Sequence, residues 1–561
     1  MELSGDSNSE SGSELEWVSP TREKKRRVDV MGNVSITGDR LALSARKRAA
    51  FAASCMNAVE VPVSLTNISV TTAWRRARTE RLEKAQSIKD NFNDPEFMIV
   101  HWDGKIVKVR EGKSSERCCV YISGTLPDGT VVQKLLGVPE IPDGTGSSQE
   151  FAVSNLLTEW NLTSNIIGVV FDTTASNTGQ WRGACALIET FLEKPVLWLA
   201  CRHHMAELHI KHVVQTATGD TKEPGVKLFK RLKSSWHDLK PNIDYQNLNK
   251  FDWNSCGDWL REEAEEVLLW ALERHKDKTF PRDDYRELLE LLITWLGGYV
   301  PKFQFHIPGA DHHARCLSKA IYYLKLALLI DHFEMDYAEK QWVYLISEYV
   351  GVFYAKYFFQ TPLSAKAPAN DLAFLQKMVR YKDIRQLMAE ATIQSIHRHL
   401  WYLTPQLVIF ALADSNVPTD ERETMAKLLH QTPRLPHDQL SSGKAKFPAV
   451  DENESSDLCL SSFIDDDSWR LFNLLELYDV LDVEWMCEPA STWPESDGYQ
   501  KFANYVHNVH VVNDLAEHGI KLISDFINKT RDEQQRQALL QVVEWHRQNY
   551  SGYTKSTLQK M

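Results

Sequence analysis

The sequence lacks any run of apolar residues near the roughly 18 that a membrane-crossing helix needs. Its first residues, MELSGDSNSESGSELEW, are polar and acidic, unlike a secretory signal peptide, which joins positive charge to an apolar stretch. We therefore expect no membrane partner and no secretion. The nine cysteines have neither the Cys-x-x-Cys pairs of a zinc module nor the density of a disulfide scaffold, and we expect reduced thiols inside a cell.

Positive charge is also in deficit. The formal net charge of −12 argues against a surface covered with DNA-binding charge, although nucleic-acid contact needs only a local basic stripe. The cluster REKKRR at Arg22–Arg27 fits a nuclear localisation signal or a merely solvated charge run. Helical periodicity at about 40–92 places a second basic set on two helices. We predict that these residues face DNA: Arg46, Lys47, Arg48, Arg75, Arg76, Arg78 and Arg81.

A chain of 561 residues exceeds what one hydrophobic core usually supports, so several domains are expected. Low apolar content predicts a disordered tail over 1–38, followed by the basic helical segment over 39–92. An α/β core is predicted to begin at 93–214, to be interrupted by an all-α insertion at 215–500, and to be completed by C-terminal helices at 501–561.

The stretch 95–200 alternates β-rich runs with turn signals. The runs are FMIVHW, KIVKV, CCVYIS, VVQKLLGV, IIGVVF and VLWLA. One helix is expected from Ser147 or Ser148 through Trp160, and a second from Thr178 to Leu192. Three strands joined by hairpins and then alternating helix and strand predict a ribonuclease-H-like mixed sheet.

Two aspartates stand beside these strands. Asp172 ends the buried run in VVFDTTASNTG, a position where open α/β sheets place active sites, although it could equally cap the next helix. Asp103 lies in IVHWDGKIV, where Asp-Gly is also a common hairpin signal. Adjacent carboxylates are costly unless a cation neutralises them, and Mg²⁺ is held by one or two carboxylates plus substrate phosphate. Together these residues therefore predict a metal site.

The Asp172 segment, followed along the chain by ACRHHMAEL, resembles the hAT DNA transposases. Their core carries two aspartates and then a Cys/Asp-x-x-His element, which here would be Cys201 and His204. The resemblance implies that Asp103 and Asp172 hold Mg²⁺ or Mn²⁺. It also implies a structural, hydrogen-bonding role for Cys201 and His204, although Cys with His can also form a metal or nucleophile site.

In these transposases a large helical insertion precedes a catalytic Glu. The helical stretch at 215–500 resembles that insertion, and the matching Glu is best sought in NVHVVNDLAEHGIKLISDF. Asp514 and Glu517 share a helix face there; we favour Glu517 as the third metal-binding carboxylate, with Asp514 as the alternative. The family usually follows this Glu with Arg and an aromatic-Ser pair, and often has an N-terminal zinc finger, neither of which this chain has.

The resemblance implies a nuclear, metal-dependent enzyme that cleaves and transfers DNA strands, acting on transposon ends and target DNA, with a homo-oligomer left open. A domesticated, catalytically inactive DNA-binding or interaction protein is the first alternative. A host ribonuclease-H-like nuclease that cleaves RNA–DNA hybrids is the second, because it shares the metal chemistry but needs no long helical insertion.

Overall fold

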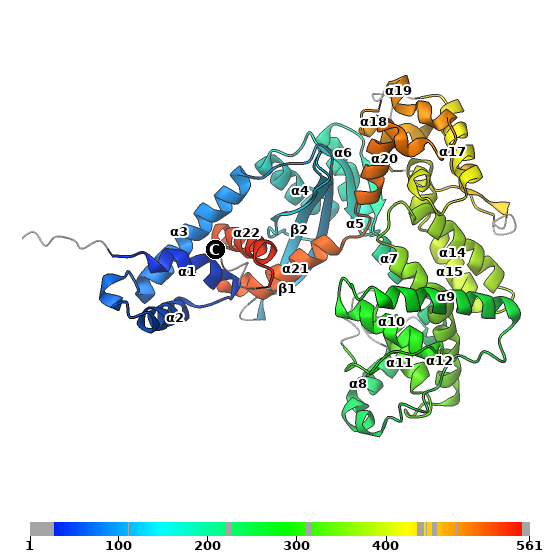
Figure 1. The fold of residues 1–561 in the computed structure, drawn as a ribbon, viewed down its shortest axis with the longest axis horizontal. Coiled ribbons are helices and arrows are strands. Elements are labelled where there is room, and N and C mark those ends of the chain that lie inside the picture. The colour runs from blue at the N-terminus through cyan, green and yellow to red at the C-terminus, as the bar shows by residue number, and fades with distance from the viewer. Residues whose placement is uncertain are drawn as a thin grey trace, which may run out of the picture. The chain divides into compact units, whose positions relative to one another are not determined.

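The computed structural model describes residues 27–109, 112–219, 226–309, 317–434, 443–444, 446–451, 457–477 and 479–552. The chain divides into two compact units, one formed by residues up to Asp90 together with those from Lys529 onward, the other by Asn91–Asn528 (Figure 1). Apart from Arg27, the basic cluster at 22–27 lies outside the described residues. No helix in the described part is long and apolar enough to cross a membrane.

The first unit is a small helical bundle. It contains α1 (Val30–Arg40), α2 (Ala45–Ala58), the short turn η1 (Val63–Leu65), α3 (Val70–Asp90) and α22 (Glu533–Asn549). Residues 30–38, expected to belong to a disordered tail, instead form most of α1. The reason is local: the Asp29 side chain caps the helix by accepting the Gly32 N–H, and Met31 is buried with Ala49 and Ala73 of α2 and α3.

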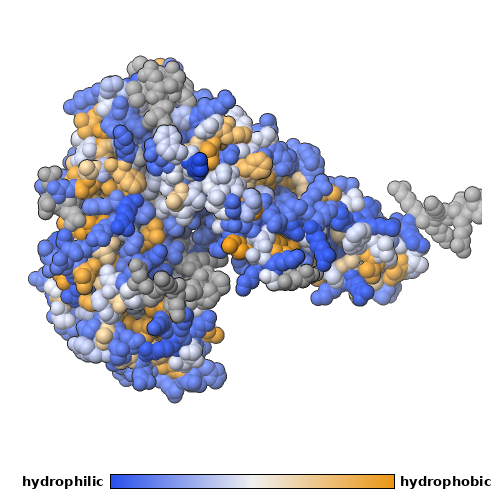
Figure 2. Space-filling model, turned by 180° about the vertical axis from the view of Figure 1, so that it is seen from behind, coloured by the Kyte–Doolittle hydropathy of each residue, from blue (hydrophilic) through white to orange (hydrophobic). Residues whose placement is uncertain are grey.

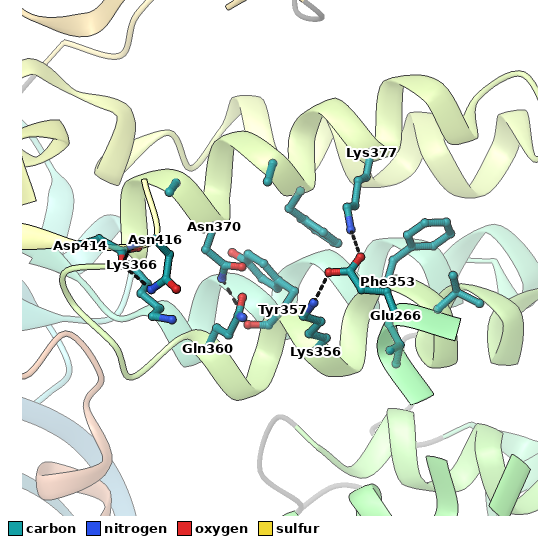
Figure 3. Close-up of a pocket in the computed structure, with 15 residues that line it drawn as sticks. Glu266, Phe353, Lys356, Tyr357, Gln360, Lys366, Asn370, Lys377, Asp414 and Asn416 are labelled. Atoms are coloured by element: carbon teal, nitrogen blue, oxygen red, sulfur yellow. Dashed lines mark hydrogen bonds and ion pairs between the residues drawn. The ribbon is translucent and has the colours of Figure 1, made fainter. Parts of the chain in front are cut away.

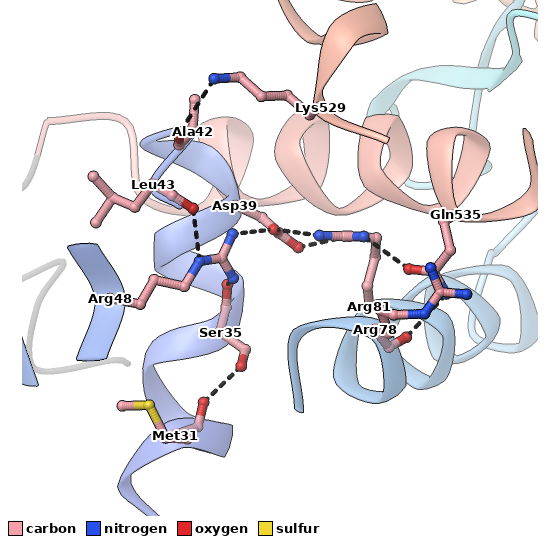
Figure 4. Close-up of polar contacts among 10 residues, drawn as sticks. All are labelled: Met31, Ser35, Asp39, Ala42, Leu43, Arg48, Arg78, Arg81, Lys529 and Gln535. Carbon is pink, nitrogen blue, oxygen red and sulfur yellow. Dashed lines mark hydrogen bonds and ion pairs between the residues drawn. The ribbon is translucent and has the colours of Figure 1, made fainter. Parts of the chain in front are cut away.

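Two of the arginines predicted to face DNA are buried in this bundle. Arg48 Nη2 lies 2.5 Å from Asp39 Oδ1, and Arg81 Nη2 lies 2.7 Å from the same oxygen (Figure 4). Arg81 also donates to Gln535 Oε1 of α22 at 2.7 Å. Both guanidinium groups join helices around the Asp39 carboxylate, so Arg48 and Arg81 lack the exposed charge on which the prediction of DNA contact rested.

The other predicted DNA-facing residues lie nearer the surface of the bundle. Arg46, Lys47 and Arg75 are exposed. Arg76 pairs with Asp29, and Arg78 pairs with Asp532, the residue that caps α22. For these five residues the DNA contact stays a prediction.

The C-terminal helices are divided between the units. Helix α21 (Asp514–Phe526) packs on the sheet, as expected for the segment 501–561, whereas α22 packs on α1 and α3. In the first unit Arg40 donates to the backbone oxygens of His546 and Tyr550, and the Gln535 side chain donates to the Arg78 oxygen. These bonds, which sequence periodicity does not reveal, hold α22 in the bundle.

The second unit is built on a five-stranded mixed sheet. Its strands are β1 (Met98–Lys108), β2 (Ser114–Thr125), β3 (Val131–Gly137), β4 (Ile166–Phe171) and β5 (Leu197–Ala200), in the order β3-β2-β1-β4-β5. Strands β1, β2 and β3 pair antiparallel, whereas β4 is parallel to β1 and β5 is parallel to β4. Strand β1 runs straight through Asp103 and Gly104, which pair with Cys119 and Cys118, so this Asp-Gly is not a turn.

Helices cover both faces of this sheet. Helix α4 (Gly146–Trp160) packs on β2 and β3, where Cys118 and Val120 join the main core. Side chains alternate along a strand, and Cys119 and Tyr121 accordingly face Gly519 of α21 on the other side. The helix expected over Thr178–Leu192 is instead split into α5 (Ala175–Thr178) and α6 (Ala184–Leu192), since Gly183 packs tightly against the turn that ends α5.

After β5 the described chain is helical, and 215–500 contains no strand among its described residues. Helix α7 (Arg202–Thr218) leads from the sheet into this helical portion, whose buried side chains are continuous with the core of the sheet. The longer helices are α8 (Lys227–Leu239), α9 (Asp258–Lys276), α10 (Asp283–Trp295), α11 (Ser318–Leu328), α12 (Tyr337–Tyr349), α13 (Ala355–Gln360), α14 (Ala367–Tyr381), α15 (Gln386–His397), α17 (Thr419–Gln431) and α20 (Asp497–Asn508).

Shorter helical turns join them: η3 (Lys240–Asn242), η4 (Val350–Tyr354), η5 (Trp401–Leu403), α16 (Pro405–Val408), η6 (Ile409–Ala413), η9 (Leu460–Phe463), η10 (Asp466–Trp469), α18 (Arg470–Leu474), α19 (Val480–Val483), η11 (Glu484–Cys487), η12 (Trp493–Glu495) and, after α21, η13 (Ile527–Lys529). On the face drawn in Figure 2, apolar residues form separate groups among hydrophilic ones. The observed class is therefore a mixed α/β protein with a large helical portion.

Candidate functional site

The two sequence-predicted aspartates lie level with each other on neighbouring strands. The parallel register pairs Val100 with Val169 and His101 with Val170. Continuing it for two residues brings Asp103 beside Asp172, which directly follows the last residue of β4. Adjacent strands are about 4.8 Å apart, so the two residues lie side by side, and the Asp172 charge acts on the Asp103 carboxyl.

The carboxyl end of β5 lies beside the carboxyl end of β4. The Cys201 N–H donates to the Phe171 oxygen at 2.9 Å, which places Cys201 next to Asp172. The thiol is buried, and it accepts a hydrogen bond from the Asn513 N–H at 3.2 Å. His204, in the first turn of α7, lies with its Nδ1 atom 3.9 Å from Asp172 Oδ2. Cys201 and His204 therefore both lie beside the aspartates.

The segment before α21 contacts β1 and the residues that follow β5. Asn513 is buried, and its Nδ2 atom donates to the Trp102 oxygen of β1 at 2.7 Å. Burial raises the pKa of Asp172, and a hydrogen bond from the Asn513 side chain to that carboxylate opposes part of the rise. Because Asn513 immediately precedes α21, these contacts fix the start of that helix over β1. Sequence reasoning missed Asn513, since a single Asn before a helix is an ordinary cap.

Electrostatics show which acidic residue of α21 reaches the pair. Burial, and then the neighbouring Asp172 charge, raise the pKa of Asp103 from 3.8 to about 7. Lys105 opposes this rise, and Glu517 adds to it. Asp514 instead interacts with His510, and burial raises the pKa of Asp514. Of the two candidates on α21, Glu517 is thus the one whose charge acts on Asp103.

The second aspartate has a mixed environment. Burial raises the pKa of Asp172, the nearby His204 and Lys105 lower it, and Glu207 of α7 raises it. Burial and the Asp172 charge also raise the pKa of the Cys201 thiol well above its ordinary value. A buried, protonated thiol is a poor nucleophile and a poor metal ligand, so Cys201 fits a structural role better than a reactive one.

Burial raises the pKa of both carboxyls, and the Asp172 charge adds to the rise at Asp103; a bound cation would favour the charged form of both groups. Among the described residues, no group of three or more His, Cys, Asp and Glu side chains forms a ready metal cage. The Asp103–Asp172 pair nevertheless fits Mg²⁺, which commonly takes one or two carboxylates and fills its other positions with water and phosphate. Asp103 and Asp172 are the residues that would hold such an ion.

Comparison with models of known protein families finds no match, and comparison with curated proteins likewise finds none.

Proposed function

We propose that the protein is a metal-dependent, transposase-like enzyme that cleaves and transfers DNA strands, with Mg²⁺ or Mn²⁺ as cofactor. The observation that carries this proposal is the level placement of Asp103 and Asp172, with the Glu517 charge acting on Asp103. Strongly perturbed carboxyl pKa values cluster at functional sites, and phosphoryl-transfer sites use paired carboxylates to hold cations.

The sheet supports the finer assignment of a ribonuclease-H-like core. Three antiparallel strands are followed by β4 parallel to β1 and β5 parallel to β4. Of the proposed metal-binding residues, Asp103 lies on the middle strand β1 and Asp172 directly follows its neighbour β4. The long helical portion lies between β5 and α21 in sequence, as the resemblance to hAT transposases implies.

Each residue of the site would have a distinct task. Asp103 and Asp172 would hold the cation, and Glu517 would add negative charge from α21. When bound, Mg²⁺ supplies charge neutralisation for the phosphate and lowers the pKa of an attacking water or 3′-hydroxyl. Asn513 fixes the start of α21 over the middle of β1 through the Trp102 oxygen, and the buried Cys201 thiol accepts the Asn513 N–H.

A nicking assay on plasmid DNA and a strand-transfer assay on the genomic DNA flanking the gene test this proposal. We expect Mg²⁺-dependent activity in the full-length protein, and its loss in Asp103→Asn and Glu517→Gln. Asp514→Asn is the matched control. It removes a carboxylate from the same helix turn, but the Asp514 charge interacts with His510 and is not among the charges that shift the Asp103 pKa. Equal activity of the Glu517→Gln variant and the unchanged protein contradicts the role of Glu517.

The alternative is a domesticated protein that keeps the fold without catalysis. The residues after Glu517 favour it, because His518, Gly519 and Ile520 stand where the transposases usually have Arg and an aromatic-Ser pair. Terminal inverted repeats flanking the gene would support the transposase, whereas DNA binding by the purified protein without any Mg²⁺-dependent cleavage would support the inactive descendant.

A further inference from the structure

A cavity of about 400 Å³ lies in the helical portion, and neither Asp103 nor Asp172 is among the residues that line it (Figure 3). It is lined by α9, η4, α13, α14 and the segment after η6. Its apolar wall includes Val352 and Phe353 of η4, a π-helical turn. Such turns are rare and occur frequently at functional sites. Cavities of this size accommodate small ligands or parts of larger ones.

One end of the cavity holds two lysines around one carboxylate. Lys356 Nζ lies 2.5 Å from Glu266 Oε1, and Lys377 Nζ lies 3.4 Å from Glu266 Oε2. The Glu266 side chain is 54% exposed, whereas those of Lys356 and Lys377 are 21% and 32% exposed. The carboxylate therefore reaches from the solvent side to two ammonium groups that are more buried than itself.

The other end carries a third lysine. Lys366 lies near Asp414 and Asn416, and the Asp414 carboxylate already accepts the Asn416 N–H and its Nδ2 group (Figure 3). The amide side chains of Gln360 and Asn370 line the stretch between the two ends. Cationic groups thus stand at both ends of a cavity whose middle offers hydrogen bonds.

We propose that this cavity binds a phosphate-bearing ligand with more than one phosphate group. One phosphate replaces the Glu266 carboxylate between Lys356 and Lys377, and Lys366 takes the second. Lysine suits this task, because its ammonium is a point charge with three rotatable donors. A nucleic-acid strand and a free polyphosphate share this chemistry. The site contains none of the residues assigned to catalysis, so it stands independently of the proposed enzyme activity.

Glu266 acts in this proposal as an internal substitute for the ligand. Three carboxylates, Glu263, Glu266 and Asp414, balance the charge of the three cavity lysines, so the site without a ligand has no net positive charge. An incoming anion gains most by displacing Glu266, which is more exposed than Glu263, at 54% against 13%. Removal of the Glu266 charge should therefore strengthen binding, the reverse of what removal of an ordinary binding residue does.

Two probes test the site in the full-length protein, in EDTA and at low salt. Isothermal titration calorimetry measures pyrophosphate binding, and fluorescence anisotropy measures binding of a labelled single-stranded oligonucleotide. We expect Lys356→Met and Lys366→Met each to weaken binding about tenfold. Glu266→Gln should tighten binding about threefold. Lys427→Met, on the exposed face of α17, is the matched control and should change nothing.

The outcomes separate the sources of the phosphate. Binding of both probes with the same variant pattern supports a nucleic-acid strand, and binding of pyrophosphate alone supports a free polyphosphate. Failure of both probes to bind overturns the site, as does binding that Lys356→Met, Lys366→Met and Glu266→Gln leave unchanged in folded protein. Asp103→Asn should bind pyrophosphate normally, which distinguishes failure here from failure of the catalytic proposal.

Discussion

Arg202 and Asp371 form a buried ion pair between the start of helix α7 and helix α14, with Arg202 Nη2 2.5 Å from Asp371 Oδ1. The Tyr357 hydroxyl donates to the same carboxylate oxygen at 3.1 Å, and the Tyr402 ring lies over the guanidinium. Arg202 directly follows Cys201, and its N–H donates to the Val511 oxygen. This one residue therefore joins the candidate site, the approach to α21 and the helical portion.

Loss of one partner of this pair should destabilise the second unit strongly. We expect Asp371→Asn to lower the free energy of unfolding by about 3–5 kcal/mol, because it leaves a buried guanidinium uncompensated. Urea unfolding followed by tryptophan fluorescence measures this. Glu273→Gln, which breaks the exposed pair with Lys276, should cost less than about 1 kcal/mol. Equal losses of unfolding free energy in the two variants would show that the buried pair does not stabilise the fold.

The Asp103–Asp172 pair should make stability fall with pH in metal-free protein. The unfolded chain releases the Asp103 proton near pH 3.8, whereas the folded protein keeps it until about pH 7. Stability from this group is therefore present below pH 3.8 and is lost as pH rises to 7. Asp103→Asn should be more stable than the unchanged protein at pH 8, by up to about 4 kcal/mol, because each unit of the rise in the Asp103 pKa corresponds to about 1.4 kcal/mol.

Thermal melting in EDTA at pH 5 and pH 8 checks this prediction. Mg²⁺ should raise the melting temperature of the unchanged protein at pH 8 and have little effect on Asp103→Asn, because binding to the folded state alone stabilises it. A variant that melts lower than the unchanged protein at pH 8 would contradict the raised pKa.

In the first unit, substitution of a buried basic residue should lower stability much more than substitution of exposed basic residues. Arg81→Met should destabilise the bundle by about 2 kcal/mol or more, since it leaves the buried Asp39 carboxylate with fewer partners. The combined change of Arg46, Lys47 and Arg75 to Met should alter stability by less than about 1 kcal/mol. Hydrogen exchange of α1–α3 reports both results.

The same exposed triple variant tests the predicted DNA contact. If these residues bind phosphates, it should weaken DNA binding and flatten the dependence of affinity on salt concentration. Unchanged affinity and unchanged salt dependence would remove Arg46, Lys47 and Arg75 from the predicted interface.

Gly519 should resist replacement despite its place in a helix. Alanine is normally the better helix former by about 1 kcal/mol. A Cβ at Gly519 would collide with Cys119 Sγ and Tyr121 of β2, however, so we expect Gly519→Ala to lower the free energy of unfolding by about 1–3 kcal/mol. His518→Ala, at the exposed neighbour, is the control. A stabilised Gly519→Ala variant would mean that α21 does not pack this closely on β2.

The order of strands and helices in the second unit could be predicted because its signals are local. Alternating apolar runs, turn residues and strand-end aspartates indicated the five strands and the position of Asp172. Periodicity likewise predicted helices throughout 215–500. The Gly179–Gly183 break was missed, since packing of Gly183 on the preceding turn is a tertiary contact.

The parts that could not be predicted depend on partners distant in sequence. From the sequence alone, Arg48 and Arg81 are predicted to face solvent, because their partners Asp39 and Gln535 are known only from the fold. Which carboxylate of α21 acts on Asp103, Asp514 or Glu517, depends on how the helix is rotated about its axis, and the contacts of Asn513 fix that rotation. The role of Arg202 was hidden in the same way, because Asp371 lies far along the chain.

The division of the first unit between the two ends of the sequence constrains synthesis. Helices α1–α3 leave the ribosome early, but α22, which supplies Gln535 to the buried Arg81, is translated only after the whole sheet-containing unit. The nascent N-terminal helices must therefore wait for their last partner, with Arg81 lacking the Gln535 contact. A premature stop after Asn528 would leave the sheet unit complete and this bundle permanently unfinished.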